Sequence, residues 1–413
     1  MATGSGKFPQ MHPVSGFRLG TASAGIKTPG RKDLVVMELC ESAFVAAVFT
    51  QNAFCAAPVT VAKQHLQTGA PRYLLINTGN ANAGTGEIGL ADAHKSCEVL
   101  ADGQFVAANQ ILPFSTGVIG ESLPMEKLLA GIPQAVAALD ENGWTDAAEG
   151  ILTTDTRPKG SSLQYTSNST SDTSLAGDLS ATVTITGITK GSGMIKPNMA
   201  TMLGFVATDA QVDPELLHRA LRLVSNKSFN RITVDSDTST NDAVVLAATG
   251  ASGVVIDESS FDQFVANLEK VFVELAQSII RDGEGASKFV SVVVDSAIDS
   301  AEAVKVAYCI AESPLVKTAL AASDANWGRI LAAVGRAGVD NLDVNNVSVS
   351  LNKVLIVEQG CRAASYTEQA GDQAMMPEDI TIQVSLNRGT ATETVWTTDL
   401  TYEYVRINAE YRT

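Results

Sequence analysis

The stretch from residue 187 to residue 210 reads GITKGSGMIKPNMATMLGFVATDA. Glycine and small polar residues lead up to Met-Ala-Thr, and an apolar run typical of a strand begins directly after Thr201. A threonine at the start of a strand is ordinarily just a residue that favours β structure. The glycine-rich approach leaves a second interpretation open, in which Thr201 takes part in chemistry.

A threonine becomes a nucleophile when its own α-amine is freed. Here the Thr201 hydroxyl would attack the carbonyl of Ala200, form an ester by an N-to-O shift, and water would complete the break. The new amine has an unperturbed pKa of about 7.7–8.0, which suits a general base at neutral pH. An oxyanion donor pair is still needed. The pair Thr116-Gly117, within FSTGVIGE at 114–121, is a candidate, although such a glycine pair is more often only a turn.

Segments typical of strands and of helices alternate loosely along the chain, which favours an α/β (α+β) layered sandwich over a helical bundle or a pure β-sandwich. Runs rich in Val, Ile and Thr predict strands at 32–39, 43–50, 72–79, 181–188, 231–236, 241–250, 288–298, 347–360 and 379–387. Apolar residues at helical spacing predict helices at 90–104, 124–139, 213–229 and 259–283. Asp213 is the expected N-cap of the third helix. The Ser- and Thr-rich segment 158–180 predicts a mobile surface loop or linker.

Composition excludes several classes of protein. The 413 residues carry a formal net charge of −16, which disfavours binding to nucleic acid and to anionic membranes. No apolar run reaches the roughly 18 residues of a membrane span, and the N-terminus lacks the apolar core of a signal peptide. Five scattered cysteines without a C-x-x-C pair indicate core thiols in a reducing cytoplasm. Four histidines without zinc-binding spacing argue against a histidine-based metal site.

A glycine pattern typical of dinucleotide-binding folds occurs at residues 84–89, GTGEIG, after a predicted strand and before a predicted helix. The segment TGNANA separates that strand from the first glycine, and no acidic residue ends a second strand about 20 residues further on. A plain glycine turn is therefore the better interpretation. A non-catalytic nucleotide-binding module remains as an alternative function.

Longer motifs follow one another in a fixed order over nearly the whole chain. They are NTGNANAGTG (77–86), STGVIGE (115–121), ILTTDTRPK (151–159), KGSGMIKPNMATMLGFVATDA (190–210), TVDSDTSTND (233–242), DGEGASKF (282–289), DANWGRILAAVGRAG (324–338) and NAEYRT (408–413). This set resembles the ornithine acetyltransferase (ArgJ) family, the bifunctional glutamate N-acetyltransferases of arginine biosynthesis. The chain departs from the family in Ala325, where proline is common, and in Ser236, where glycine is usual.

The resemblance implies a self-cleaving fold with N-terminal-nucleophile chemistry, which the family shares with a group of self-cleaving aminopeptidases. The precursor would cut itself between Ala200 and Thr201. An α chain of residues 1–200 and a β chain of residues 201–413 would then stay associated, as heterotetramers or larger assemblies.

The resemblance also implies roles for individual residues. Thr201 would be the nucleophile, and Thr116 and Gly117 would form the oxyanion hole. The positions that match substrate contacts of the family are Thr153 or Thr154, with Thr154 preferred, Lys190, Thr201, Glu284, Asn408 and Thr413. Lys190 and the Asn408 amide suit a carboxylate, and Glu284 suits an ammonium group.

The implied reaction is ping-pong acetyl transfer. Thr201 takes the acetyl group of N2-acetylornithine while its α-amine relays the proton, and glutamate then accepts the acetyl group. No metal or redox cofactor is implied. Some family members also use acetyl-CoA to make N-acetylglutamate, and the sequence leaves this open. The alternative is a threonine-dependent amidase or aminopeptidase of the same fold, with water as the acceptor.

Overall fold

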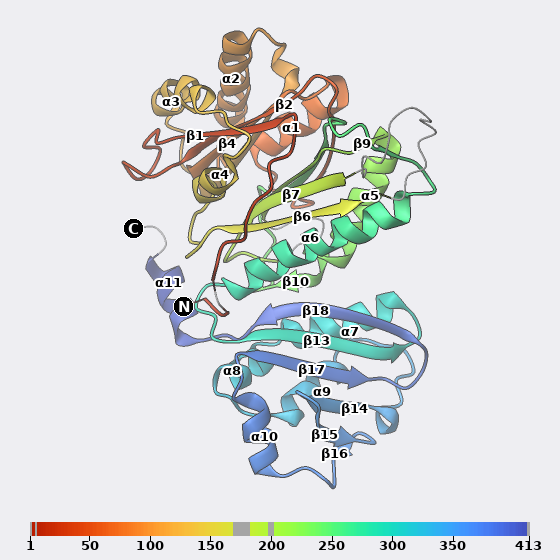
Figure 1. Ribbon diagram of the computed structural model, residues 1–413. Helices are drawn as coiled ribbons and strands as arrows, with labels where there is room; N and C mark the ends of the chain where they lie inside the picture. Colours follow the sequence, from red (N-terminus) through yellow and green to blue (C-terminus); the bar gives the residue numbers. More distant parts are fainter. Residues whose placement is uncertain (1, 5, 168–181, 197–201, 411–413) are drawn as a thin grey trace.

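The structure is a computed structural model, and it describes residues 2–4, 6–167, 182–196 and 202–410. Ala200, Thr201 and Thr413 lie outside these residues, as does most of the Ser- and Thr-rich segment. The chain forms a layered sandwich of helices and sheets, and a further sheet with its own helices lies beside it (Figure 1).

The first sheet of the sandwich has the strand order β1-β2-β4-β5. Its strands are β1 (Phe17–Ala22), β2 (Leu34–Leu39), β4 (Tyr73–Asn80) and β5 (Ile111–Val118). Leu34 and Val36 of β2 face one side and Val35 and Met37 the other, as the two-residue repeat of a strand requires. The side with Leu34 and Val36 packs on the helices α1 (Ala57–Thr68), α2 (Gly86–Gln104) and α3 (Met125–Ala137).

The second sheet lies against the other side of the first. Its order is β3-β11-β8-β7-β6, formed by β3 (Phe44–Phe49), β11 (Ala243–Ala248), β8 (Leu203–Thr208), β7 (Thr182–Lys190) and β6 (Lys159–Thr166). Val35 and Met37 share a buried cluster with Phe205 and Val245 of this sheet. The rings of Phe114 and Phe205 meet edge to face across the two sheets at 5.2 Å between centroids.

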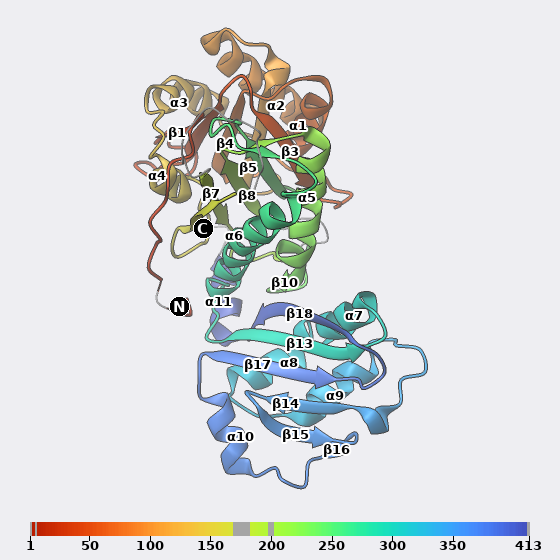
Figure 2. The same ribbon diagram turned by 45° about the vertical axis from the view of Figure 1, so that its right-hand side comes forward.

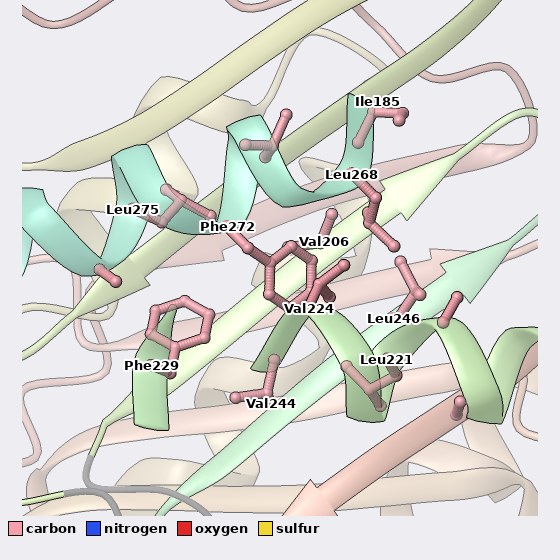
Figure 3. Packing of buried hydrophobic residues seen from close by; sticks show 14 of the residues in the cluster. Ile185, Val206, Leu221, Val224, Phe229, Val244, Leu246, Leu268, Phe272 and Leu275 are labelled. Atoms are coloured by element: carbon pink, nitrogen blue, oxygen red, sulfur yellow. The ribbon is translucent and has the colours of Figure 1, made fainter. Parts of the chain in front are cut away.

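Two helices cover the outer face of the second sheet, α5 (Pro214–Lys227) and α6 (Phe261–Arg281). Figure 3 shows Phe272 and Leu275 of α6 and Leu221 of α5 packed over Val206 and Val244 of the sheet. The predicted cap is confirmed, because the Asp213 side chain accepts a hydrogen bond from the backbone N–H of Glu215. The order helix, sheet, sheet, helix confirms the predicted layered α/β class.

The loop predicted for residues 158–180 is wrong where the structure describes it. Residues 159–166 form β6, which pairs antiparallel with β7 along its whole length. The polar side chains find partners there instead of water: the Ser161 hydroxyl donates to Glu274 at 2.5 Å, and the Ser162 and Thr186 hydroxyls lie 2.7 Å apart. A Ser- and Thr-rich composition is compatible with a strand when its hydroxyl groups are satisfied in this way.

A further sheet has the order β10-β18-β13-β17-β14-β15-β16 and lies below α6 in the view of Figure 2. It is formed by β10 (Ile232–Thr233), β18 (Ala391–Thr398), β13 (Phe289–Ala297), β17 (Asp379–Ser385), β14 (Ser348–Leu351), β15 (Val354–Glu358) and β16 (Cys361–Arg362). Its core includes side chains of α7 (Ser300–Ala311), α8 (Pro314–Ala321), α9 (Trp327–Gly335) and α10 (Glu368–Met375). In the described part of the chain no helix is long and apolar enough to cross a membrane.

The predicted boundary between an α and a β chain falls inside a sheet. β7 precedes the predicted cleavage point and β8 follows it, and the two strands pair antiparallel from Ile185 opposite Thr208 to Lys190 opposite Leu203. The two segments are therefore neighbours within one layer. The division itself remains a prediction.

A buried ion cluster connects the start of β6 to the end of α6, and we call it the Lys159 cluster. The Lys159 ammonium lies 2.6 Å from a carboxylate oxygen of Asp155 and 2.6 Å from one of Asp282, and each of the three side chains is at most 1% exposed. Asp155 also accepts a hydrogen bond from the N–H of Gly191 at 2.7 Å. Burial alone would raise the pKa of Asp155, but the charges of Lys159 and Lys190 outweigh it and lower that pKa.

Replacing Lys159 by methionine is expected to destabilise the protein by about 3–5 kcal/mol, because two buried carboxylates lose their cation. Lys95→Met is the matched control, since Lys95 and its partner Glu98 are both more than half exposed. Chemical unfolding of the two variants measures the difference. An equal midpoint for both variants would contradict the role given to the cluster.

Candidate active site

A cavity of about 260 Å³ opens where the ends of β5 and β7 meet α11 (Tyr402–Glu410). It brings together every predicted site residue that the structure describes. Its lining contains Thr116, Gly117, Thr153, Thr154, Lys190, Glu284 and Asn408, together with Val118, Ile119, Gly193, Met194, Ile195, Met202, Leu203, Ser239, Asn241 and Asp242. These residues come from segments nearly 300 positions apart, so the cavity exists only in the folded chain.

Thr116 and Gly117 lie at the end of β5, beside β4. Gly117 has φ +136°, and a Cβ atom there would overlap the backbone of Gly79 and Asn80. Only glycine fits this position, because the two parallel strands approach each other too closely for a side chain. Gly117 therefore lines the cavity with backbone atoms alone, as an oxyanion site needs.

A hydrogen bond links Thr116 to Lys190. The Lys190 ammonium donates to the Thr116 hydroxyl oxygen at 3.2 Å, and both residues are buried. An ammonium group has no acceptor, so the threonine oxygen must accept, and its own proton is free to point elsewhere. The Thr116 hydroxyl is thus a donor polarised by a cation. Burial lowers the pKa of Lys190 below its ordinary value, and nearby carboxylates, Asp155 first among them, oppose this shift.

The KGSG and DGEG motifs dock onto each other. The N–H of Glu284 donates to the carbonyl of Ser192 at 2.9 Å, and the Ser192 hydroxyl donates to the carbonyl of Asp282 at 2.8 Å. A Cβ atom on Gly193 would collide with the Glu284 carboxylate. The glycine at 193 therefore lets the carboxylate reach the cavity wall.

Glu284 is 8% exposed and faces the cavity beside Asn408. Burial raises the pKa of Glu284, and hydrogen bonds from Thr154 and Asn408 oppose this shift. The Asn408 amide donates to Glu284 at 2.8 Å, and Asn408 belongs to α11, which Thr401 anchors through a hydrogen bond to the carbonyl of Gly285. The C-terminal helix thus forms part of the wall.

Both members of the threonine pair line the cavity, but they have different partners. The N–H of Thr153 donates to Asp155 at 3.0 Å, whereas Thr154 bonds to Glu284. The Thr154 side chain is therefore the one directed to a predicted substrate contact.

Sequence reasoning missed three acidic or amide residues of the TVDSDTSTND motif. The Asp235 carboxylate accepts the N–H groups of Met194 and Ile195 at 2.6 and 2.8 Å and so shapes the loop after the KGSG motif. The Asn241 amide donates to the carbonyl of Ser115, next to Thr116 in β5, at 2.9 Å. Asp242 lies in the lining itself. The dense polar run of the motif was a signal, but nothing in it indicated which side chains turn inward.

A second hollow of about 180 Å³ adjoins the first and shares Gly117, Val118, Thr153 and Thr154 with it. Its wall also includes Lys27 and Arg31, which are exposed cations. The carboxylate of Asp33, in the same wall, accepts the backbone N–H groups of Ala24 and Ile26, which fix its position.

Of the predicted nucleophile and its sequence neighbours, the structure describes only the residue that follows the nucleophile. Ala200, Thr201 and Thr413 lie outside the described residues. Met202, which follows Thr201 in the sequence, is 2% exposed and lines the cavity, and its carbonyl accepts the N–H of Ala243 at 3.0 Å. A residue bonded directly to the predicted nucleophile is thus part of the wall.

Known proteins are similar to this chain in length and in sequence. A profile described as "ArgJ family" matches residues 18–413. The arginine biosynthesis bifunctional proteins ArgJ of Pseudomonas syringae pv. tomato and of Pseudomonas fluorescens are each 55% identical over 417 residues, with full coverage of both chains. A crystal structure of the bifunctional protein argJ from Bacillus halodurans is 39% identical, has a TM-score of 0.49, and covers 51% of this chain and 99% of its own. The resemblance drawn from the motifs is confirmed: this chain belongs to the ArgJ family.

Proposed function

We propose that this protein is a self-cleaving acetyltransferase of arginine biosynthesis, which moves the acetyl group of N2-acetylornithine to glutamate through an ester on Thr201. The observation that carries the proposal is one cavity in which the Thr116-Gly117 pair, the Lys190 ammonium and the Glu284 carboxylate meet. Membership of a family whose curated relatives are named for arginine biosynthesis supports it.

The reaction has two half-steps. The Thr201 hydroxyl oxygen attacks the acetyl carbonyl carbon while the α-amine of Thr201 takes the hydroxyl proton. Thr116 and Gly117 stabilise the oxyanion, the carbon–nitrogen bond breaks, and the departing ornithine amine receives the proton. The neutral amine of glutamate then attacks the ester carbonyl carbon and gives a proton to the α-amine of Thr201. The bond between the acetyl carbon and the Thr201 oxygen breaks, the α-amine returns the proton to that oxygen, and N-acetylglutamate leaves.

The charged side chains that line the cavity indicate how an amino-acid substrate would bind. An amino-acid substrate brings a carboxylate and an ammonium group. Lys190 is the donor for the carboxylate, and Glu284 is the acceptor for the ammonium. Thr154 and Asn408 hold the Glu284 carboxylate in place before the substrate arrives.

A self-cleaving amidase or aminopeptidase would use the same nucleophile with water as the acceptor. Family membership favours acetyl transfer over this alternative. Comparing the rate of acetyl transfer to glutamate with the rate of plain hydrolysis separates the two activities.

We further propose that the cleaved chains work in the cytoplasm as an assembly of two α and two β chains. The cysteines are unpaired, which fits a reducing compartment. Pairing of β7 with β8 supports lasting association of the two chains after cleavage. Native mass measurement tests the stoichiometry.

Thr201→Ala is expected to abolish self-cleavage, because the attacking hydroxyl is removed. Intact-mass analysis of the purified wild type should give two fragments, with a new N-terminus at Thr201, and the variant should give one chain. Thr201→Ser keeps a hydroxyl and should still cleave. Unchanged cleavage in Thr201→Ala would sink the mechanism.

Glu284→Gln is expected to lower kcat/KM for N2-acetylornithine about 10- to 100-fold, since a hydrogen bond to a charged group contributes roughly 1.5–3 kcal/mol. Steady-state kinetics measure the change. Glu98→Gln is the control, because Glu98 lies in an exposed ion pair on α2. Equal kcat/KM values for the two variants would remove Glu284 from substrate binding.

Acetyl-CoA is a second acetyl donor in our proposal, and the second hollow is the observation that favours it. This hollow meets the first at Gly117, and Lys27 and Arg31 lie in its wall. A long donor with phosphate groups needs such cations, while the acetylated amino acid needs only the first cavity.

Lys27→Ala is expected to raise KM for acetyl-CoA several-fold and to leave KM for N2-acetylornithine unchanged. Lys27→Arg keeps the charge and should retain most of the affinity. Formation of N-acetylglutamate from each donor gives both constants. An equal effect on both donors would show that the hollow is not specific to acetyl-CoA.

A further inference from the structure

One carboxyl group of the cavity has an oxygen atom without a hydrogen-bond partner among the residues that the structure describes. Asp242 is 3% exposed and lines the cavity, and its Oδ2 atom has no hydrogen-bond partner in the part of the chain that the structure describes. Other buried acids differ in this respect. Asp155 and Asp282 are each held by Lys159 and by backbone N–H groups.

Burying a carboxyl group with one unsatisfied oxygen atom lowers the stability of the folded state when no ligand is bound. Burial raises the pKa of Asp242 well above its ordinary value, and neither its hydrogen bonds with Ser239 nor the charge of Lys190 restores it. A folded state that binds this proton more tightly than the unfolded chain loses stability as the pH rises above about 4. Folded proteins leave few buried polar atoms without a partner, and a role in catalysis or binding is one reason to keep such an atom.

The position of Asp242 points to the kind of partner. It immediately precedes β11, where Ala243 lies opposite Leu203 and donates to the carbonyl of Met202, so Asp242 is level with the residue after Thr201. The other ionisable groups of the described lining are Lys190 and Glu284. The Lys190 ammonium donates to Thr116 and does not donate to the Oδ2 atom of Asp242. The open Oδ2 atom therefore needs a further donor, and an amine supplies both a proton and a compensating charge.

We propose that the Asp242 carboxyl is the acceptor for a primary amine in this cavity. The inference rests on the proposed function and adds a residue to the substrate contacts of Lys190, Glu284 and Asn408. Two amines have the required chemistry: the amino group of the substrate, and the α-amine that cleavage frees at Thr201. Asp242 ionises as it pairs with either amine, so the cost of its burial is offset only in the occupied or cleaved site.

Asp242→Asn tests the proposal, because it keeps the shape of the side chain and removes its charge. In the Thr201→Ala background, where the chain stays uncleaved and no substrate is bound, adding Asp242→Asn is expected to give an equal or higher Tm at pH 7.5, since an unfavourable buried acid is removed. Intact mass reports whether the chain still cleaves. Steady-state kinetics with N2-acetylornithine from pH 5.5 to 9.5 then distinguish the two amines.

If the substrate amine is the partner, KM rises about 10- to 100-fold and the pH dependence of kcat is unchanged. If the Thr201 amine is the partner, KM is unchanged and the acidic limb of kcat moves to lower pH, because the amine loses a carboxylate that favours its charged form. Wild-type values of kcat, KM and pH profile would overturn the proposal.

Asp237→Asn is the matched control, since Asp237 belongs to the same loop and is exposed. It should leave both constants unchanged. If Asp242→Asn does not fold, Asp242→Ser carries the same test with a smaller side chain, and unfolding of both variants would assign Asp242 to the fold and overturn the proposal. The wild-type rate tests the proposed function separately, because only the ratio of variant to wild type reports on Asp242.

Discussion

The ammonium of Lys159, held between the carboxylates of Asp155 and Asp282, joins the parts of the chain that carry the cavity. Asp155 belongs to the loop with the threonine pair and holds Gly191. Asp282 accepts from Thr156 and precedes Glu284. Because charges this deeply buried are favourable only when they are paired, the cluster forms as a unit or not at all. The catalytic wall is therefore set by a contact that no substrate touches.

Hydrogen bonds fix the backbone around the cavity, whereas one buried carboxyl oxygen in its lining has no partner among the described residues. Asn241 fixes the backbone beside Thr116, and Asp235 fixes the loop after the KGSG motif. Asp242 follows Asn241 directly in the lining, and its Oδ2 atom has no hydrogen-bond partner among the described residues. The buried carboxyl of Asp242 lowers the stability of the fold, and the hydrogen bonds to backbone groups around it raise that stability. This is expected where a fold positions polar groups for a ligand.

Local sequence signals predicted many helices and strands of the sandwich, but few of the tertiary contacts that support the site. α5 follows from the capping pair Asp213-Pro214, and α6 from a long apolar stripe. β6 was missed because its hydroxyl groups are satisfied by Thr186 and by α6, which the sequence does not reveal. α7, α8 and β18 also went unpredicted, since the core that selects them is assembled from distant segments. Family motifs located Thr116, Lys190 and Glu284, whereas the partners of Lys159 emerge only from tertiary contacts.

The pairing of β7 with β8 has a consequence for the life of the folded protein. Before cleavage these strands belong to one chain and meet at a rate independent of protein concentration. After a cut between residues 200 and 201 the same pairing joins two separate polypeptides, so reassembly from the unfolded state becomes bimolecular and slows on dilution. A protein cleaved as we propose would reach its native state once, as a precursor, and would afterwards depend on a high barrier to unfolding for its survival.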